Sequence, residues 1–193
     1  MHRRNFLIGA ASAFAAPGLA GAQALDFGLA VALGAEARAL KPELYDPAYQ
    51  RIPYPMGDVA DDRGVCADTV IRAFRAAGAD LQQLVHIDMA AHFAAYPKIW
   101  GLTRPDTNID HRRVPNLETY FARAGAKLAP ADQLAPGDVV SWRIPVPHIG
   151  VVTTKMSASG RPLMAHNIGA GTQVEDVLLA WPIQGRFRYR PIA

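Results

Sequence analysis

The sequence predicts an α+β domain in which helices come first and an antiparallel sheet follows. Apolar residues recur at helical spacing through roughly the first two thirds of the chain. Short β-branched and apolar runs, separated by Pro, Gly and Ser, fill the remainder. Because the two patterns do not alternate, a parallel sheet built from βαβ units is not expected.

Helical periodicity indicates four helices, at residues 25–41, 66–77, 80–96 and 117–124. The first stops before Pro42, and the second and fourth are followed by Gly78 and Gly125, in the place where a glycine commonly ends a helix. Between the third and fourth helices, from residue 97 to 116, the chain is rich in polar groups and is expected to be a loop.

Four strands are expected after a Pro-Gly-Asp turn, at residues 139–142, 148–154, 161–166 and 185–189. The hairpin between the second and third strands decides where two histidines lie. If it turns at Ser157, His148 lies directly opposite His166, and a turn nearer Ser159 offsets the pair by a few residues. In both cases the two imidazoles are neighbours at one edge of the sheet.

The first 24 residues form a predicted export signal of the twin-arginine type. An arginine pair precedes an apolar stretch that Pro17 and Gly18 interrupt, and small residues offer cleavage after Ala22 or Ala24. The apolar run is short for a membrane span. We therefore expect cleavage, a periplasmic location, no stable membrane span in the mature protein, and a single domain over residues 25–193.

Charge and cysteine content narrow the classes of function. Removing the signal deletes two arginines and lowers the net charge from +3 to +1, because 18 Lys and Arg then face 17 Asp and Glu. No basic surface of the kind that binds nucleic acid is indicated. A mature chain of about 170 residues buries a core without disulfides or a structural metal. Cys66, which has no second cysteine to pair with, is therefore either a small buried side chain or a nucleophile.

The predicted position of Cys66 favours the nucleophile. It lies in the first turn of a helix, where free backbone N–H groups and the helix dipole stabilise a thiolate. His148 begins one strand and His166 ends the next. If that edge of the sheet packs against the start of the helix, the three side chains form a Cys–His–His relay, and the Cys66 N–H is an oxyanion donor.

Several short motifs carry a family resemblance. The chain resembles the NlpC-type cell-wall peptidases, which are papain-like cysteine hydrolases, in Tyr54-Pro55-Met56-Gly57, Cys66, Pro136-Gly137-Asp138-Val139-Val140, His148-Ile149-Gly150-Val151-Val152 and Met164-Ala165-His166-Asn167. It is more closely similar, over residues 45–190, to an uncharacterised bacterial family assigned to that superfamily, in Gly64-Val65-Cys66-Ala67-Asp68, Asp110-His111-Arg112-Arg113-Val114-Pro115-Asn116 and His166-Asn167-Ile168-Gly169. The resemblance implies a papain-like fold, with N-terminal helices packed on an antiparallel sheet, and hydrolysis of amides in peptidoglycan stem peptides through a cysteine thioester, without a cofactor.

The resemblance also implies roles for individual residues. Cys66 is the nucleophile, His148 the general base and His166 the residue that orients the base. Tyr54 matches a tyrosine near the nucleophile that assists the oxyanion site. Asn167 is an alternative to His166, because an amide oxygen also accepts from an imidazole N–H, and strand alternation places only one of the two on the active face.

The sequence departs from the NlpC pattern around the nucleophile. The family usually has Asp-Cys-Ser-Gly, whereas Val65-Cys66-Ala67-Asp68 stands here, and Asp58 replaces a glycine. Substrate specificity therefore does not transfer. Asp68 opposes thiolate formation unless it is paired, and it is either structural or a substrate contact.

Four consecutive polar residues, Asp110, His111, Arg112 and Arg113, stand in the expected loop. They form either a salt-bridged surface loop or a clamp in which an arginine fork grips a substrate carboxylate. A zinc site built from His86, His92 and His111 is not expected, because positions six apart on one helix lie on separate faces.

The sequence is also compatible with two alternatives to hydrolysis. The same thioester could pass its acyl group to an amine or hydroxyl, which would make the protein an acyltransferase. A non-catalytic cell-wall-binding module with an idle Cys66 is the second alternative. Neither the bond that is cleaved nor the need for an activating partner or an oligomer follows from the sequence.

Overall fold

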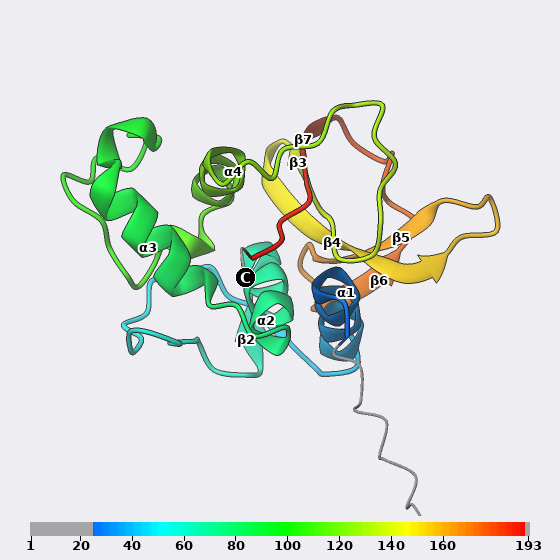
Figure 1. Ribbon diagram of the computed structural model, residues 1–193. Coiled ribbons are helices and arrows are strands. Elements are labelled where there is room, and N and C mark those ends of the chain that lie inside the picture. Colours follow the sequence, from blue (N-terminus) through cyan, green and yellow to red (C-terminus); the bar gives the residue numbers. More distant parts are fainter. Residues whose placement is uncertain (1–24, 192–193) are drawn as a thin grey trace, which may run out of the picture.

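The computed structural model describes residues 25–191, so the predicted export signal lies outside the described residues. The described chain is α+β, as predicted. Its helices are α1 (Phe27–Arg38), α2 (Cys66–Ala76), α3 (Leu81–Ala91) and α4 (Val114–Arg123). Its main sheet is antiparallel, with strand order β6-β5-β4-β3-β7, and consists of β3 (Val139–Ile144), β4 (Val146–Met156), β5 (Pro162–Asn167), β6 (Thr172–Glu175) and β7 (Ile183–Phe187). Figure 1 shows α3 at the left, α2 in the middle and α1 beside the sheet.

Local chemistry explains where the helices begin. Asp26 and Asp80 precede α1 and α3 and accept the backbone N–H groups of Leu29 and Gln82, each at 3.1 Å. A proline in the first turn of α4 suits a position that needs no N–H donor. The residue before α2, Val65, has no side-chain oxygen to cap the helix. Its own N–H is instead satisfied by the Asp68 carboxylate at 2.7 Å.

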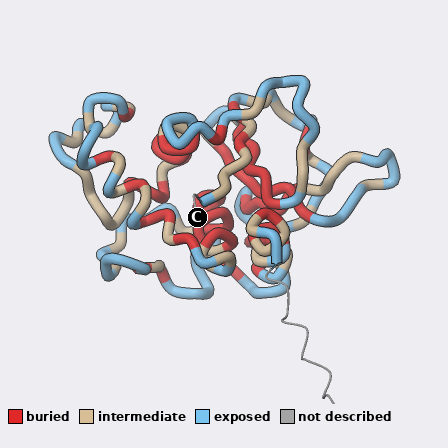
Figure 2. Tube along the Cα trace, in the orientation of Figure 1, coloured by how far each residue is buried: buried red, intermediate tan, exposed pale blue. Residues whose placement is uncertain are grey.

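The sheet has an apolar cluster on each face. On one face, Val139, Ile149, Val151 and Ala165 pack with buried residues of α1 and α2. On the other, Val140, Trp142, Val152 and Met164 pack with Leu178. This division follows from strand alternation, and Figure 2 shows buried chain where α1 and α2 meet the sheet. Residues of β4 with odd numbers therefore face the helices.

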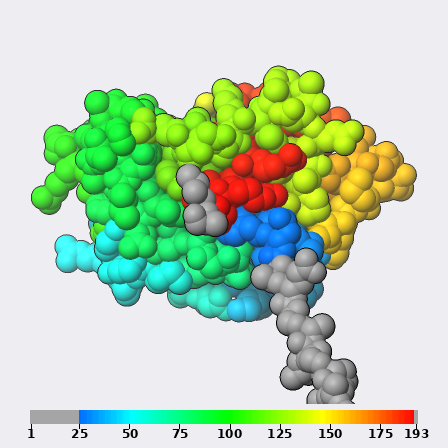
Figure 3. Space-filling view, in the orientation of Figure 1, coloured from blue at the N-terminus to red at the C-terminus, as the bar shows by residue number. Residues whose placement is uncertain are grey.

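The C-terminal segment completes the helix side of the core. The ring of Tyr189 lies 6.1 Å from Phe27 of α1, 5.8 Å from Phe74 of α2 and 5.9 Å from Tyr120 of α4, measured between ring centroids. Figure 3 shows this segment against α1 on the surface. Three helices and the end of the chain are thus joined by one aromatic cluster. Within residues 25–191 no helix is long and apolar enough to cross a membrane.

The segment at residues 97–116 has no helix or strand up to residue 109, as expected, but it is not a loop over its whole length. It contains a 3-10 turn, η2 (Asp110–Arg112), and its end belongs to α4, which starts at Val114. All three residues of η2 are buried, and two of them pair inside the protein, Asp110 with Arg113 and Arg112 with Asp68. The third predicted helix is also shorter than expected: α3 ends at Ala91 and a separate turn, η1 (Phe93–Ala95), follows.

Three short strands escaped the sequence analysis. Besides β6, the chain forms a parallel bridge between β1 (Leu44–Tyr45) and β2 (Arg63–Gly64), with Tyr45 opposite Gly64. Strands of two residues show no periodicity, so pattern analysis has nothing to detect. The bridge nevertheless matters, because it brings Tyr45 next to the chain that enters α2.

The β4–β5 hairpin has the second of the two predicted registers. Met156 pairs with Pro162, and after an irregularity Gly150 pairs with His166. His148 is therefore two residues out of line with His166, and the two side chains meet diagonally across the strands. Gly150 makes room for this meeting, since a Cβ there would lie 3.0 Å from the His166 Cβ and 3.3 Å from a Trp142 ring carbon.

Candidate active site

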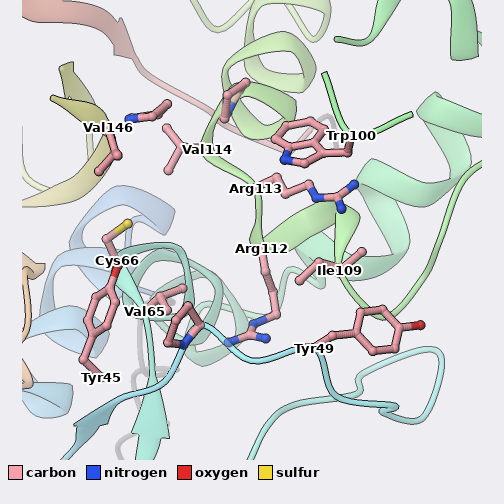
Figure 4. A pocket seen from close by; sticks show the side chains of 13 residues that line it. Tyr45, Tyr49, Val65, Cys66, Trp100, Ile109, Arg112, Arg113, Val114 and Val146 are labelled. Atoms are coloured by element: carbon pink, nitrogen blue, oxygen red, sulfur yellow. The ribbon is translucent and has the colours of Figure 1, made fainter. Parts of the chain in front are cut away.

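Cys66 lies in the wall of a surface pocket of about 450 Å³. It is the first residue of α2 and is only 5% exposed. The pocket is enclosed by β1, η2, the start of α4 and the start of β4, and Figure 4 shows Cys66 between Tyr45 and Val146 at one side of it. The residues from β4 are Val146 and Pro147, which directly precede His148.

The thiol of Cys66 is not a preformed thiolate. The pKa of Cys66 is raised to about 11: burial raises it most, hydrogen bonding from the backbone N–H of Ile149 opposes this, and the negative charge of Asp68 adds to it. The N–H groups at the start of α2 also lower the pKa, but by less than burial raises it. The helix start thus favours the thiolate, as expected, but loss of water outweighs this effect and the net pKa of the thiol is raised.

His148, His166 and Glu175 form a hydrogen-bonded chain. His148 Nε2 lies 2.9 Å from His166 Nδ1, and His166 Nε2 lies 3.0 Å from Glu175 Oε2. Both imidazoles are buried, and the ring of His148 stacks on Trp142 at 5.7 Å and meets Trp181 edge-on at 6.1 Å. The two indoles shield the link between the histidines from water.

Both histidines are held neutral by their surroundings. Burial, together with a smaller effect of the neighbouring His166, lowers the pKa of His148 to about 4. Burial also lowers the pKa of His166, although the Glu175 carboxylate opposes the shift. At neutral pH the relay consists of two neutral rings that end on a carboxylate.

The structure brings His148 and His166 together. It places Cys66 beside β4, the strand that carries His148, but among the described residues the thiol makes no hydrogen bond to an imidazole. The contact runs through the backbone, since Ile149, whose N–H meets the sulfur, follows His148 directly. The His148 ring lies with Trp142, on the sheet face away from α2.

Asn167 does not orient the base. Its amide nitrogen donates to Glu43 at 3.2 Å and its oxygen accepts the Gly169 N–H at 3.0 Å. Alternation along β5 turns it away from the face that carries His166. Glu175, which does contact His166, was missed because β6 was not predicted. The sequence signal for it is weak: one glutamate in a four-residue strand.

Asp68 is paired, and its partner is Arg112. The two carboxylate oxygens accept from Arg112 Nε and Nη2, each at 2.9 Å, and both residues are buried. With the Val65 N–H at 2.7 Å, the Asp68 carboxylate makes three charge-assisted or backbone hydrogen bonds. Asp68 is thus structural. The guanidinium of Arg112 is occupied by this pair, so it is not the free clamp for a substrate carboxylate.

The other members of the polar cluster separate. Asp110 is buried and pairs with Arg113 at 3.3 Å. His111 is buried, and burial with the charge of Arg112 lowers its pKa to about 4. Arg113 lines the pocket and lies over the ring of Trp100, 4.2 Å from the ring centroid, an arrangement that Figure 4 shows. Arg113 is the member of the cluster that has both pocket access and an incompletely used guanidinium.

The tyrosine near the nucleophile is Tyr45, and the assignment of Tyr54 is wrong. The Tyr54 ring packs edge-on against His86 at 5.0 Å and does not line the pocket. Tyr45 lines it, and Figure 4 shows its ring beside Cys66. Burial raises the pKa of Tyr45, and the nearby Cys66 raises it further. Tyr45 was missed because only the β1–β2 bridge brings it to this position.

Over residues 25–191 no cluster of three or more His, Cys, Asp or Glu side chains is arranged to hold a metal ion. The site consists of a thiol, a tyrosine and an arginine that line one pocket, and of a histidine relay whose first member, His148, directly follows the pocket residues Val146 and Pro147. These groups are equipped for nucleophilic attack and proton transfer.

Comparison with known proteins places this site in a family. The family described as "Domain of unknown function (DUF1287)" matches residues 32–189. The chain belongs to the DUF1287 family. A relative is the "Uncharacterized protein YijF" of Escherichia coli (strain K12), which is 53% identical over 167 residues, with 83% of this chain and 81% of the relative covered.

A solved structure is also similar to this DUF1287 chain. It is described as "Structure of NlpC1 from Trichomonas vaginalis" and matches with a TM-score of 0.47 and 13% sequence identity. The match covers 86% of this chain and 45% of that one, so the chain spans just under half the length of the structure it resembles. These values do not assign a fold or an activity.

Proposed function

We propose that this protein is a periplasmic papain-like cysteine amidohydrolase that cuts an amide in peptidoglycan stem peptides or related peptides. The observation that supports this most directly is the position of Cys66. The thiol begins a helix, borders an open pocket and touches the backbone of β4 one residue after His148. The motifs around these residues, which resemble those of NlpC-type peptidases, supply the substrate class, and the predicted export signal supplies the location.

The proposed reaction starts from a neutral thiol and a neutral imidazole. As Cys66 attacks the amide carbon, its proton passes to His148, which returns it to the leaving amine and then activates water against the thioester. Thiol and imidazole have to approach to hydrogen-bond distance for the first step. Such contacts often tighten only when substrate is bound. The Cys66 N–H and the Tyr45 hydroxyl are the proposed donors to the oxyanion.

Arg113 is the proposed contact for a substrate carboxylate. Its guanidinium is held over Trp100 at the pocket wall and pairs with the Asp110 carboxylate through one bond of 3.3 Å. Peptide stems with several carboxylates fit such a group. Arg113 alone therefore takes the role of carboxylate clamp that the sequence suggested for the whole polar cluster.

Digestion of purified sacculi tests the proposal. Wild-type protein should release soluble peptide-bearing fragments that mass spectrometry detects, and Cys66→Ala should release none above background. His148→Ala should be at least about a hundredfold slower, because general-base catalysis commonly contributes that much. The matched control is His92→Ala, since His92 lies on the surface at the end of α3.

Identical digests from wild type and Cys66→Ala would refute the hydrolase. The structure offers one specific reason to keep a non-catalytic binding module in view, which is the high pKa of a thiol that touches no histidine. Binding of Cys66→Ala and wild type to sacculi with equal affinity, without release of fragments by either, would support that module.

A further inference from the structure

We infer that Glu175 is a positioning residue that fixes which nitrogen of His148 can accept the proton of Cys66. The inference rests on the proposed function and deepens it, because it concerns the same relay. It starts from one asymmetry in the chain of hydrogen bonds. Two imidazoles can exchange donor and acceptor roles, whereas a carboxylate can only accept.

The carboxylate fixes the tautomer of His166. Glu175 Oε2 lies 3.0 Å from His166 Nε2, so Nε2 must carry a proton and donate. A neutral imidazole has one N–H, and burial keeps His166 neutral by lowering its pKa. His166 Nδ1 is therefore a bare acceptor, and it faces the other ring.

The tautomer of His166 in turn fixes that of His148. His166 Nδ1 lies 2.9 Å from His148 Nε2, so His148 must donate from Nε2. Its only bare nitrogen is then Nδ1. This atom is also the ring nitrogen nearer to the strand backbone, where the N–H of the next residue, Ile149, contacts the sulfur of Cys66.

The proton step follows from this order. The S–H bond of Cys66 breaks, its proton binds His148 Nδ1, and the sulfur electron pair forms the bond to the amide carbon. The positive charge that appears on His148 is stabilised through His166 by the carboxylate. In the reverse order His148 would carry its proton on Nδ1, and neither ring nitrogen would be left to accept the proton of Cys66, because Nε2 would then accept from His166.

Glu175 is the end of the relay that decides which nitrogen donates and which accepts in each hydrogen bond. The Trp142 and Trp181 rings cover the pair of histidines, and the His166 side chain is 0% exposed. The Glu175 side chain is 48% exposed, so without it water would reach His166 Nε2. Water both donates and accepts, and it imposes no direction.

Nitrogen NMR of the ¹⁵N-labelled protein tests the assignment at neutral pH without any substrate. Wild type should show Nε2 protonated and Nδ1 bare in both His148 and His166. Glu175→Ala should give mixed tautomers in both rings. The matched control is Asp176→Ala, which removes the neighbouring negative charge but only breaks a surface pair with Arg161 at 2.8 Å, and it should keep the wild-type pattern.

A proton on Nδ1 of His148 in wild type would overturn the inference, and so would an unchanged tautomer pattern in Glu175→Ala or the same change in Asp176→Ala. In sacculus digestion, Glu175→Ala should lower kcat roughly tenfold to a hundredfold, a typical cost of losing the partner that orients a histidine, with little change in KM. The two proposals fail separately. A Cys66→Ala variant that digests like wild type refutes the hydrolase alone, and the tautomer pattern is read in either case.

Discussion

At the scale of single residues, the site is organised around uncharged groups. The neutral Cys66 thiol is produced by burial and by Asp68, whose carboxylate is in turn held by Arg112. This differs from a resting thiolate–imidazolium pair. The thiol then loses its proton during the attack on the amide carbon, so a bare nitrogen on His148 must be ready to accept it.

The pH dependence of alkylation follows from the state of the thiol. Iodoacetamide reacts with the thiolate, whose fraction rises with pH up to the pKa, so the rate for folded protein should keep rising toward pH 11. At neutral pH it should be about two orders of magnitude slower than for a free cysteine of pKa about 8.5. Mass spectrometry of Cys66 measures it. Urea-unfolded protein is the control and should show the ordinary midpoint, whereas a folded-state midpoint below 8 would mean a preformed thiolate.

The residue types that carry the chemistry were predictable, but several of their partners were not. The lone cysteine and the two strand histidines stood out by type and position, and the charge argument required a partner for Asp68. That partner, Arg112, is 44 residues away in sequence, and spacing along one chain does not reveal such a contact. The raised pKa of the thiol was not predictable, because the sequence does not show how deeply Cys66 is buried.

At the scale of elements, the two-residue strand β1 controls which tyrosine reaches the nucleophile. Its parallel bridge to β2 sets Tyr45 opposite Gly64, two residues before Cys66. Tyr54 lies instead beside His86. Longer elements were predicted well because helical and strand periods repeat over several turns or pairs. β1, β2 and β6 were missed because they are too short to repeat.

Matched tyrosine variants test this placement. Tyr45→Phe removes a hydroxyl next to Cys66 and should slow fragment release from sacculi by roughly a hundredfold, the lower end of the range seen when an oxyanion donor is lost. Tyr54→Phe makes the same chemical change away from the pocket and should leave the rate within a factor of about two. The rates come from initial release of soluble fragments. The opposite ranking would return the role to Tyr54.

At the scale of the whole molecule, the helices and the sheet supply different groups to the site, and the two sets of groups meet at one edge of the sheet. The helix half supplies the thiol and most of the pocket, and the sheet half supplies a relay that is buried on the far face under two indoles. The order of helices and strands was predictable from composition along the chain. Which face of β4 carries His148 was not, because it depends on register with β3 and β5.

The central claim is that Cys66 forms a thioester with the acyl part of a cleaved amide. Rapid acid quenching of wild-type protein with peptidoglycan fragments, followed by intact-mass and peptide mass spectrometry, tests it most directly. We expect an acyl adduct on Cys66 that hydroxylamine removes, that is absent from Cys66→Ala, and that appears at the rate of early product release. Product release at the wild-type rate by Cys66→Ala, or turnover with no adduct on Cys66 at any quench time, would contradict it.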